Sequence, residues 1–287
     1  MGLWFRLGRT PRIPRAPMPF DPAPLPPAPR RVGAVNWIGL QTLYAREVKR
    51  FLKVHLQTIS APVVTTLLFY AVFALALGGV VRTAGDVPFL QFLGPGLVMM
   101  AMVQNAFANT SSSMTIAKMQ GNIVDILMPP LSPLELTVGF MAGGITRGIL
   151  VGVVTAAAIW VFVPLGLHSP LFILYHAVMA CGMLALLGTI AGIWATKFDH
   201  ISAFTNFLVQ PLAFLSGTFY TLDRLPEAMW WLAHLNPFFY MIDGFRYGFI
   251  GQSDGTLAVG AAVKFAVNAA LFLACHTLIA SGYKLKA

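Results

Sequence analysis

Long apolar runs without charges restrict how this chain can fold more than any other feature. Arg147 is the only Asp, Glu, Lys or Arg between Glu135 and Lys197, and none occurs from Val54 to Val81. A helix needs about 20 consecutive apolar residues to cross a bilayer, and such runs favour helices over the ten-residue strands of a barrel. Only 10% of the residues are charged, against about 25% in soluble domains. The sequence predicts an all-α integral membrane protein.

Six transmembrane helices are predicted within the region 58–287. Their approximate ranges are 59–81, 89–116, 136–163, 170–195, 201–221 and 257–281. Arg147 falls inside the third span, and we expect it to face protein or to reach toward the near end of that span, because a charge left in lipid is costly. Amides and hydroxyls in the second half of the second span are typical of hydrogen bonds between helices.

Two segments precede the spans. Residues 1–33 form a proline- and arginine-rich arm, which is expected to be cytosolic, extended and disordered, because it cannot bury enough apolar surface. Residues 34–57 repeat apolar side chains with the period of a helix and carry basic residues on the other side. This pattern predicts an amphipathic helix that lies along the cytosolic membrane surface. The apolar stripe comprises Trp37, Leu40, Leu43, Tyr44, Val48, Phe51 and Leu52, and the basic residues are Arg46, Lys49, Arg50 and Lys53.

A short amphipathic helix is predicted within 118–130, between the second and third spans. Its apolar side would carry Ile123, Ile126, Leu127 and Met128. Pro129 and Pro130 end this helix, since proline lacks an N–H and clashes with the preceding turn. Ser132 and Pro133 then signal the start of the third span, with Glu135 suited to its first turn. A plain loop that ties two spans together is the alternative interpretation of this segment.

Residues 222–251 form neither a clean span nor a polar loop. Pro226 and Pro237 divide the segment into two short pieces. Its tryptophans, tyrosines and phenylalanines favour the level of the lipid head groups. We therefore expect a re-entrant pair of short helices, dipping into the membrane from one side before the last span. The aromatic residues are Trp230, Trp231, Phe238, Phe239, Tyr240 and Tyr247.

The net charge of +9 follows the predicted topology. Ten of the 19 Lys and Arg residues precede the first span, and Lys118, Lys197, Lys284 and Lys286 fall on the same side if six spans alternate. Only Arg82, Arg224 and Arg246 fall on the opposite side. Basic residues concentrate in cytoplasmic loops, so both termini are predicted to be cytosolic and a nucleic-acid partner is not indicated.

Motifs for chemistry are missing from the sequence. Cys181 and Cys275 lie in apolar runs without ligand spacing, so neither a disulfide framework nor a metal site is expected. Asp199 and His200 are adjacent at the edge of a span, but their surroundings fit no catalytic motif. No GxxxxGK[ST] sequence occurs, so the usual loop for nucleotide phosphates is absent and any ATP would be hydrolysed by another polypeptide.

From about Val35 to its end, the chain resembles the membrane subunits of ABC-type-2 exporters. The resemblance rests on the basic helix, the six spans, the segment PPLSPLEL after the short helix, and the re-entrant sequence LPEAMWWLAHLNPFFYMIDGFRYGFIG. It is closest to the bacterial branch that exports lipo-oligosaccharides and drugs. The resemblance implies a multi-pass protein of the bacterial inner membrane that pairs as a homodimer. It also implies two copies of a separate ABC ATPase, which bind ATP and magnesium, whereas this chain binds no cofactor and catalyses no reaction.

The resemblance also assigns residues to two sites. Contacts that couple the chain to the ATPase would involve Gln120, Asn122, Ile123, Asp125, Ile126, Leu127 and Met128, together with Arg46, Glu47 and Arg50. The substrate path, between two copies, would be lined by Tyr70, Phe73, Gln104, Asn105, Asn109, Asn206, Gln210, Phe214 and Tyr220. Aromatic rings with scattered amides suit an amphipathic molecule, such as a glycolipid, a lipo-oligosaccharide or a drug, moved by alternating access. Packing is an equally good explanation for each path residue alone, and a channel or ion-coupled secondary transporter without an ATPase is the rival function.

Overall fold

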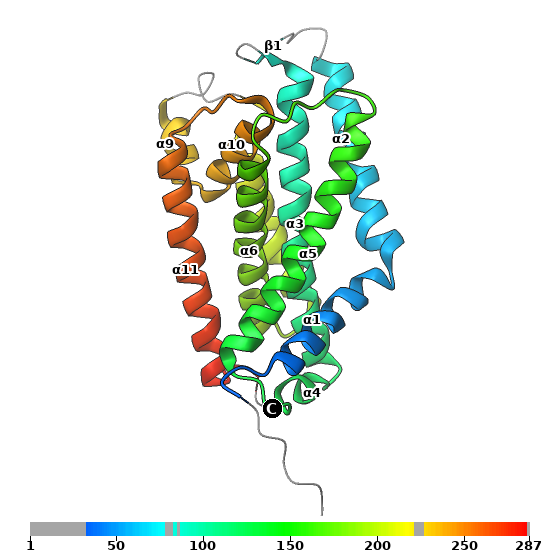
Figure 1. Ribbon diagram of the computed structural model, residues 1–287, viewed down its shortest axis with the longest axis vertical. Helices are drawn as coiled ribbons and strands as arrows, with labels where there is room; N and C mark the ends of the chain where they lie inside the picture. Colours follow the sequence, from blue (N-terminus) through cyan, green and yellow to red (C-terminus); the bar gives the residue numbers. More distant parts are fainter. Residues whose placement is uncertain (1–32, 78–82, 85–86, 221–226, 286–287) are drawn as a thin grey trace, which may run out of the picture. The chain divides into compact units, whose positions relative to one another are not determined.

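Helix α3, Phe89–Met119, is the element against which most others pack in the computed structural model (Figure 1). Around it lie α5 (Pro133–Trp160), α6 (Pro170–Trp194) and α10 (Pro237–Ile250). The structure describes residues 33–77, 83–84, 87–220 and 227–285. Val35–Ala287 is one structural unit, and the predicted arm 1–33 lies, except for its last residue, outside the described residues.

The helix predicted near the N-terminus is present as α1, Trp37–Leu52, and the Asn36 side chain caps it by accepting a hydrogen bond from the Gly39 N–H. Its buried face differs from the predicted apolar stripe, because Leu43 and Phe51 are buried together with Glu47, whereas most of Trp37 is exposed. Gly139 and Gly143 of α5 explain the difference. A Cβ at either glycine would collide with Leu43 or Glu47, so the glycines admit that side of α1.

Five helices in the described residues are long and apolar enough to cross a membrane: Leu56–Ala76, Phe89–Met119, Pro133–Trp160, Pro170–Trp194 and Leu257–Ser281. The first comprises a π turn, η1 (Leu56–Ser60), and most of α2 (Ala61–Leu77), and the last is α11. These helices correspond to the first, second, third, fourth and sixth predicted spans. The described helices begin and end within a few residues of the predicted limits, except that the end of the first predicted span, 78–81, lies outside the described residues.

The fifth predicted span, 201–221, is shorter and more irregular than expected. It is built from α7 (Phe198–Phe204), a π turn η2 (Thr205–Val209) and α8 (Gln210–Phe214). Pro211 has no N–H and cannot donate a hydrogen bond to the preceding turn. This proline lies just after the end of the π turn at Val209. Beyond α8 the chain is irregular from Leu215 to Tyr220, with Gly217 at φ 74°.

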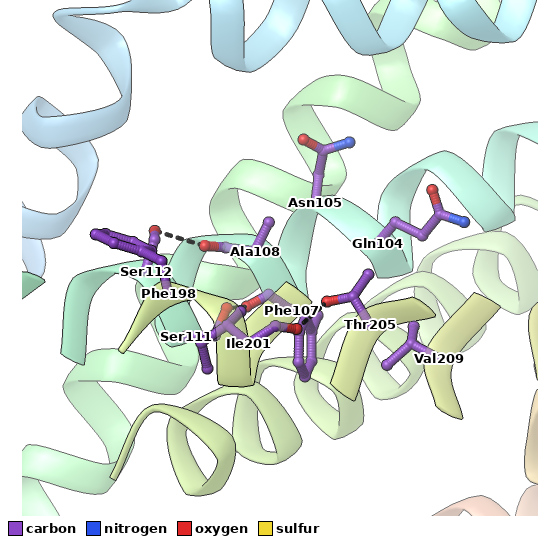
Figure 2. A pocket seen from close by; sticks show the side chains of 10 residues that line it. All are labelled: Gln104, Asn105, Phe107, Ala108, Ser111, Ser112, Phe198, Ile201, Thr205 and Val209. Atoms are coloured by element: carbon purple, nitrogen blue, oxygen red, sulfur yellow. Dashed lines mark hydrogen bonds between the residues drawn. The ribbon is translucent and has the colours of Figure 1, made fainter. Parts of the chain in front are cut away.

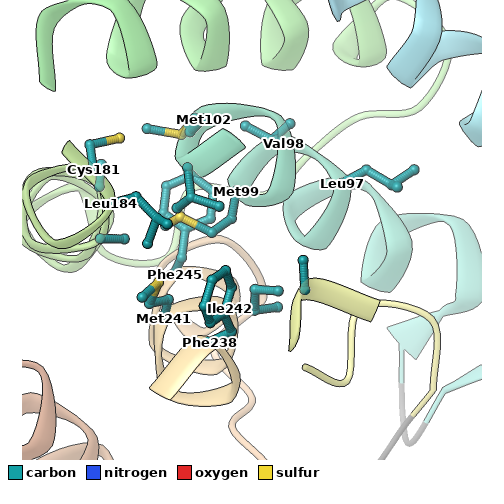
Figure 3. Packing of buried hydrophobic residues seen from close by; sticks show 14 of the residues in the cluster. Leu97, Val98, Met99, Met102, Cys181, Leu184, Phe238, Met241, Ile242 and Phe245 are labelled. Carbon is teal, nitrogen blue, oxygen red and sulfur yellow. The ribbon is translucent and has the colours of Figure 1, made fainter. Parts of the chain in front are cut away.

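Apolar side chains fill the space between α3, α6 and α10 (Figure 3). Met99 of α3, Leu184 of α6 and Phe245 of α10 are almost fully buried there. Glycines bring the backbones of neighbouring helices close together. A Cβ at Gly148 of α5 would lie 2.9 Å from the Met102 carbonyl oxygen of α3. Small residues commonly allow such close packing between membrane helices.

Smaller elements complete the fold. Strands β1 (Thr83–Ala84) and β2 (Val87–Pro88) pair antiparallel between the first two spans. Helix α4, Ile123–Leu127, confirms the short helix after α3. In Figure 1, α1 and α4 lie at one end of the helices, called the α4 end below, and β1 lies at the opposite end, called the hairpin end.

Two helices confirm the division of 222–251 at Pro237: α9 (Glu227–Leu235) and α10, which starts with Pro237 and has Asn236 as its N-cap. The aromatic residues separate between them. Trp231 of α9 is largely exposed, as a head-group anchor should be, but Phe238 and Phe239 of α10 are buried in the protein. Part of the predicted aromatic belt is therefore core, because α10 packs on α3 and α6.

Candidate functional site

The short helix α4 has one face fixed to its own chain and one face open. Ile123 and Ile126 are buried in a cluster with α1, α3 and α5 residues such as Leu43. Val124 and Met128 are 49% and 77% exposed, respectively, and Asp125 is exposed beside them. Gln120 and Asn122, just before α4, are exposed as well, and Leu127 is half-buried. The coupling residues named from the sequence thus divide between a packed face and an open face.

Hydrogen bonds of Glu135 and Asn36 connect the starts of α1 and α5 to the segment that follows α4. Ser132 and Glu135 form a capping box at the N-terminus of α5, as the sequence predicted for this start. The Glu135 Oε1 atom also accepts a hydrogen bond of 2.5 Å from the backbone N–H of Asn36. The Asn36 side chain in turn donates to the carbonyl of Pro130, which follows α4. Through these bonds α1, α4 and α5 are held together at the α4 end.

Glu47 and Arg50 face into the protein. The Glu47 carboxylate is fully buried, accepts a hydrogen bond of 2.6 Å from Ser113 of α3, and lies 3.2 Å from Arg50. The Arg50 guanidinium donates to the backbone carbonyl and the side-chain oxygen of Asn109, at 2.6 and 3.0 Å, and to Ser112. Both residues therefore connect α1 to α3 and do not form an open contact surface.

Arg147 lies inside the bundle, as expected for a charge within a span. It is 8% exposed and donates a hydrogen bond of 2.9 Å to the side-chain oxygen of Asn105. Asn105 itself donates to the carbonyl of Ala101, one turn earlier in α3. One amide thus holds the arginine of α5 against α3.

Two clefts lie on α3 and share Gln104 and Asn105. One has a volume of about 320 Å³ and lies between α3 and the helices α7 and η2 (Figure 2). Its other walls include Ser111, Phe198 and Thr205. The second, of about 330 Å³, lies between α3 and the first span, where Gln57 and Thr65 contribute further polar atoms. Amide and hydroxyl side chains therefore occur in otherwise mostly apolar clefts on α3, between the first span and α7–η2.

Residues named for the substrate path fall into three groups. Gln104, Asn206, Gln210 and Phe214 are exposed or half-exposed. Phe73 and Tyr220 lie near the end of α8, where the Phe73 ring stacks on Phe219 with ring centroids 4.6 Å apart. Tyr70, Asn105 and Asn109 are buried and already bonded: the Tyr70 hydroxyl donates to the Leu90 carbonyl, and the two amides hold arginines. Of all these residues, Gln104 and Asn105 line the clefts, and the hydrogen bonds of the third group hold helices together.

A buried cluster of charges around α10 was missed by the sequence analysis. Arg246, expected on the side of the membrane opposite the termini, is 2% exposed, donates a hydrogen bond of 2.8 Å to the Gly217 carbonyl and lies 3.6 Å above the Phe92 ring. Its burial was not predicted, because it follows a run of aromatic residues typical of a membrane surface, whereas α10 packs against α3 and α6. The chain is not helical after α8, so the Gly217 carbonyl has no helical N–H as a partner. Arg246 supplies the hydrogen bond that this buried carbonyl needs.

Lys264 of α11 belongs to the same region and is fully buried. It contacts the His176 ring of α6 and donates to the carbonyl of Tyr240 at 2.9 Å. Asp243 of α10 accepts hydrogen bonds from the backbone N–H groups of Asp254 and Gly255. The sequence signal that could have predicted this cluster is Lys264, the one charged residue of its span, because a charge within a span needs partners in the protein.

Five long apolar helices and the clefts on α3, which contain amide side chains, are typical of an integral membrane protein. Within the described residues, no three His, Cys, Asp or Glu side chains gather as a metal site would require. Comparison with known proteins identifies the family. The ABC-2 type transporter family matches residues 39–250, and this chain belongs to that family as a transport permease.

Curated relatives agree. The chain is 37% identical over 250 residues to the inner membrane transport permease YadH of Escherichia coli K12, covering 87% of this chain and 98% of YadH. It is 27% identical over 251 residues to nodulation protein J of Rhizobium leguminosarum bv. viciae, covering 83% of this chain and 94% of that protein. The chain is accordingly a multi-pass membrane subunit of an ABC transporter.

Proposed function

We propose that this chain is the membrane subunit of an ATP-driven exporter in the bacterial inner membrane. Two copies pair, and each binds a separate ABC ATPase at its α4 end, which faces the cytosol together with both termini. In this arrangement the run 198–220 serves as the fifth of six spans, and α9 and α10 form the re-entrant pair. ATP and magnesium bind to the ATPase, and this chain supplies no catalytic group.

The two-faced helix α4 is the observation that carries the proposal. A helix with one buried apolar face and a second exposed apolar edge, Val124 and Met128, suits insertion into a cleft of a partner protein. Asp125, Gln120 and Asn122 provide a polar rim next to that edge. We assign the docking contact to these five residues and the exposed Arg46. Ile123, Ile126 and Leu127 instead pack α4 against the rest of the chain.

Movement of the docked ATPase reaches the spans through the bonds of α1 and α4. Glu135 joins α1 to the start of α5, and Glu47 with Arg50 joins α1 to α3. Because packed interfaces switch between discrete arrangements, closure of two ATPase subunits would rock α3 and α5 and open a path between the two copies.

The substrate path in this proposal follows the polar clefts on α3. Gln104 lies in both clefts, and Asn206 and Gln210 are exposed on the neighbouring η2 and α8. Amides at this depth are costly in lipid, so a second copy or a substrate should cover them. Mixed amide and aromatic surfaces suit an amphipathic substrate such as a glycolipid, a lipo-oligosaccharide or a drug. Nodulation protein J bears a name tied to nodulation, and we carry no substrate over from it.

The test is co-purification of the full-length chain from its native host in mild detergent. We expect an ABC ATPase to accompany the wild-type chain in equal amounts and to be lost from Val124→Asp and Met128→Asp. Leu167→Asp is the matched control, because Leu167 is 63% exposed in the segment between α5 and α6. Absence of any ATPase from the wild-type preparation would instead favour the rival function, a channel or an ion-coupled transporter.

A further inference from the structure

A wide cleft at the α4 end lies between α1, the start of the first span and the end of α3. Its volume is about 970 Å³. Four basic side chains line it within two turns of α1: Arg46, Lys49, Arg50 and Lys53. Its walls also include apolar residues, among them Ile38, Phe51, Val54 and Ile116. The cleft therefore combines concentrated positive charge with an apolar wall.

The positive charge of this basic cleft is only partly neutralised by the protein. Glu47 is the one carboxylate of α1, and it is buried against Arg50 and Ser113. In the part of the chain that the structure describes, Arg46, Lys49 and Lys53 form no ion pair, and all three are exposed. Three cations are thus available to an anion that enters the cleft.

The cleft also lies where a membrane surface would meet the protein. Helix α1 ends at Leu52, and the first candidate span begins at Leu56, so the cations stand within a few residues of lipid-facing chain. Val54 and Leu56 are 50% and 72% exposed next to Lys53. An anion that carries apolar chains fits this sequence of charge followed by exposed apolar surface.

We propose that the basic cleft binds the phosphate of an anionic phospholipid, with the head group against Lys49 and Lys53 and the acyl chains along the first span. The proposal rests on the cytosolic orientation of the α4 end proposed above, because the inner leaflet supplies the lipid. It needs no particular substrate and no ATPase. An acidic protein segment is less suitable, since the wall beside the cations is apolar and continues into a membrane span.

Binding is tested on the purified full-length chain without ATPase. Phosphatidylglycerol and phosphatidylcholine with identical acyl chains are titrated in a neutral detergent, and bound lipid is counted by native mass spectrometry. We expect phosphatidylglycerol to bind at least tenfold more tightly, with a preference that falls as salt rises. The variant Lys49→Gln/Lys53→Gln should weaken phosphatidylglycerol binding about 10- to 30-fold.

The matched control is Lys197→Gln/Lys284→Gln, which removes the same charge at the α4 side but outside the cleft. Equal affinity of both double variants would overturn the proposal. Displacement of the lipid by inorganic phosphate at similar concentrations would also overturn it, because the site would then recognise a free anion. If the cleft variant keeps its lipid but loses a co-purifying ATPase, the cleft is a protein-docking surface. These outcomes are independent of the Met128→Asp experiment, so either proposal can fail alone.

Discussion

The Glu47 carboxylate of α1 accepts a hydrogen bond of 2.6 Å from the Ser113 hydroxyl of α3, and no part of Glu47 is exposed. Arg50, one turn later, continues the connection to the Asn109 carbonyl. A helix expected to lie loosely on a membrane surface is therefore bonded to the central helix of the bundle. Any force on α1 is passed to α3 through this polar contact.

Replacing Glu47 by Ala should lower the stability of the folded chain by about 3 kcal/mol, because it leaves Arg50 without its counter-charge in a largely buried place. Glu47→Gln should cost less, since an amide oxygen still accepts from Ser113. Reversible denaturation in mixed detergent micelles measures both values. Asp125→Ala is the control: it removes an exposed carboxylate and should change stability by less than about 0.5 kcal/mol. A cost for Glu47→Ala no larger than for Asp125→Ala would contradict this account.

The two faces of α4 should respond differently to substitution. Ile126→Ala removes a side chain that is 3% exposed and should destabilise the chain by about 2–4 kcal/mol. Met128→Ala, on the open face, should leave the unfolding midpoint unchanged while weakening ATPase binding. Thermal unfolding of the chain alone and pull-down of the ATPase separate these effects. Equal loss of stability in both variants would show that α4 has no free face.

Sequence reasoning placed the helices well because hydrophobicity and proline determine where they begin and end. Ser132, Pro133 and Glu135 predicted the start of α5, and the structure has a capping box there. The sequence did not distinguish the two faces of α4, because Ile126 and Met128 have similar hydrophobicity. Ile126 is buried only because its side of α4 contacts α1 and α5 in the folded chain.

The same limit explains the polar residues. Asn105 and Asn109 looked like path residues because nothing in the sequence shows that arginines of other helices reach them. Arg246 was expected within the re-entrant segment at a membrane surface because aromatic residues surround it, whereas tertiary packing buries it against Phe92. Long-range partners, rather than local pattern, decide where such side chains lie.

Close helix packing gives a matched pair of glycine substitutions. Gly148→Ala should destabilise the chain by about 1–3 kcal/mol, because the new Cβ would lie 2.6 Å from the Cys181 sulfur and 2.9 Å from the Met102 carbonyl oxygen. Gly182→Ala, in α6, should be neutral or stabilising by up to about 1 kcal/mol, since its nearest neighbour would be at an ordinary 3.4 Å. Unfolding in mixed micelles measures both. If Gly148→Ala proved as stable as Gly182→Ala, α3 and α5 would be less tightly packed than the structure shows.

Substitutions at Gln104 and Asn109 of α3 should have different effects, the first on transport and the second on stability. Gln104 lies in both clefts and makes no hydrogen bond to another side chain among the described residues, so Gln104→Ala should alter the rate or choice of exported compounds and leave the unfolding midpoint within about 1 °C. Asn109→Ala removes an acceptor of the Arg50 guanidinium and should cost about 1–3 kcal/mol. Export assays in membrane vesicles, paired with thermal unfolding, test this division. Unchanged export of every tested amphiphile by Gln104→Ala would remove it from the path.

Arg246 should hold the irregular segment after α8 in place. Arg246→Ala leaves the Gly217 carbonyl without its donor, removes the cation above Phe92 and removes the positive charge 3.9 Å from the Asp254 carboxylate, so we expect a loss of about 3–5 kcal/mol. Arg246→Lys can still donate one bond but lacks the planar group that stacks on the ring, and should recover only part of the loss. Hydrogen exchange of residues 215–220 reports the effect directly. Because the guanidinium bonds to this segment and not to α11, exchange should rise there first, while the amides of α11 stay protected; a uniform rise in both would mean that Arg246 stabilises the whole bundle rather than this turn.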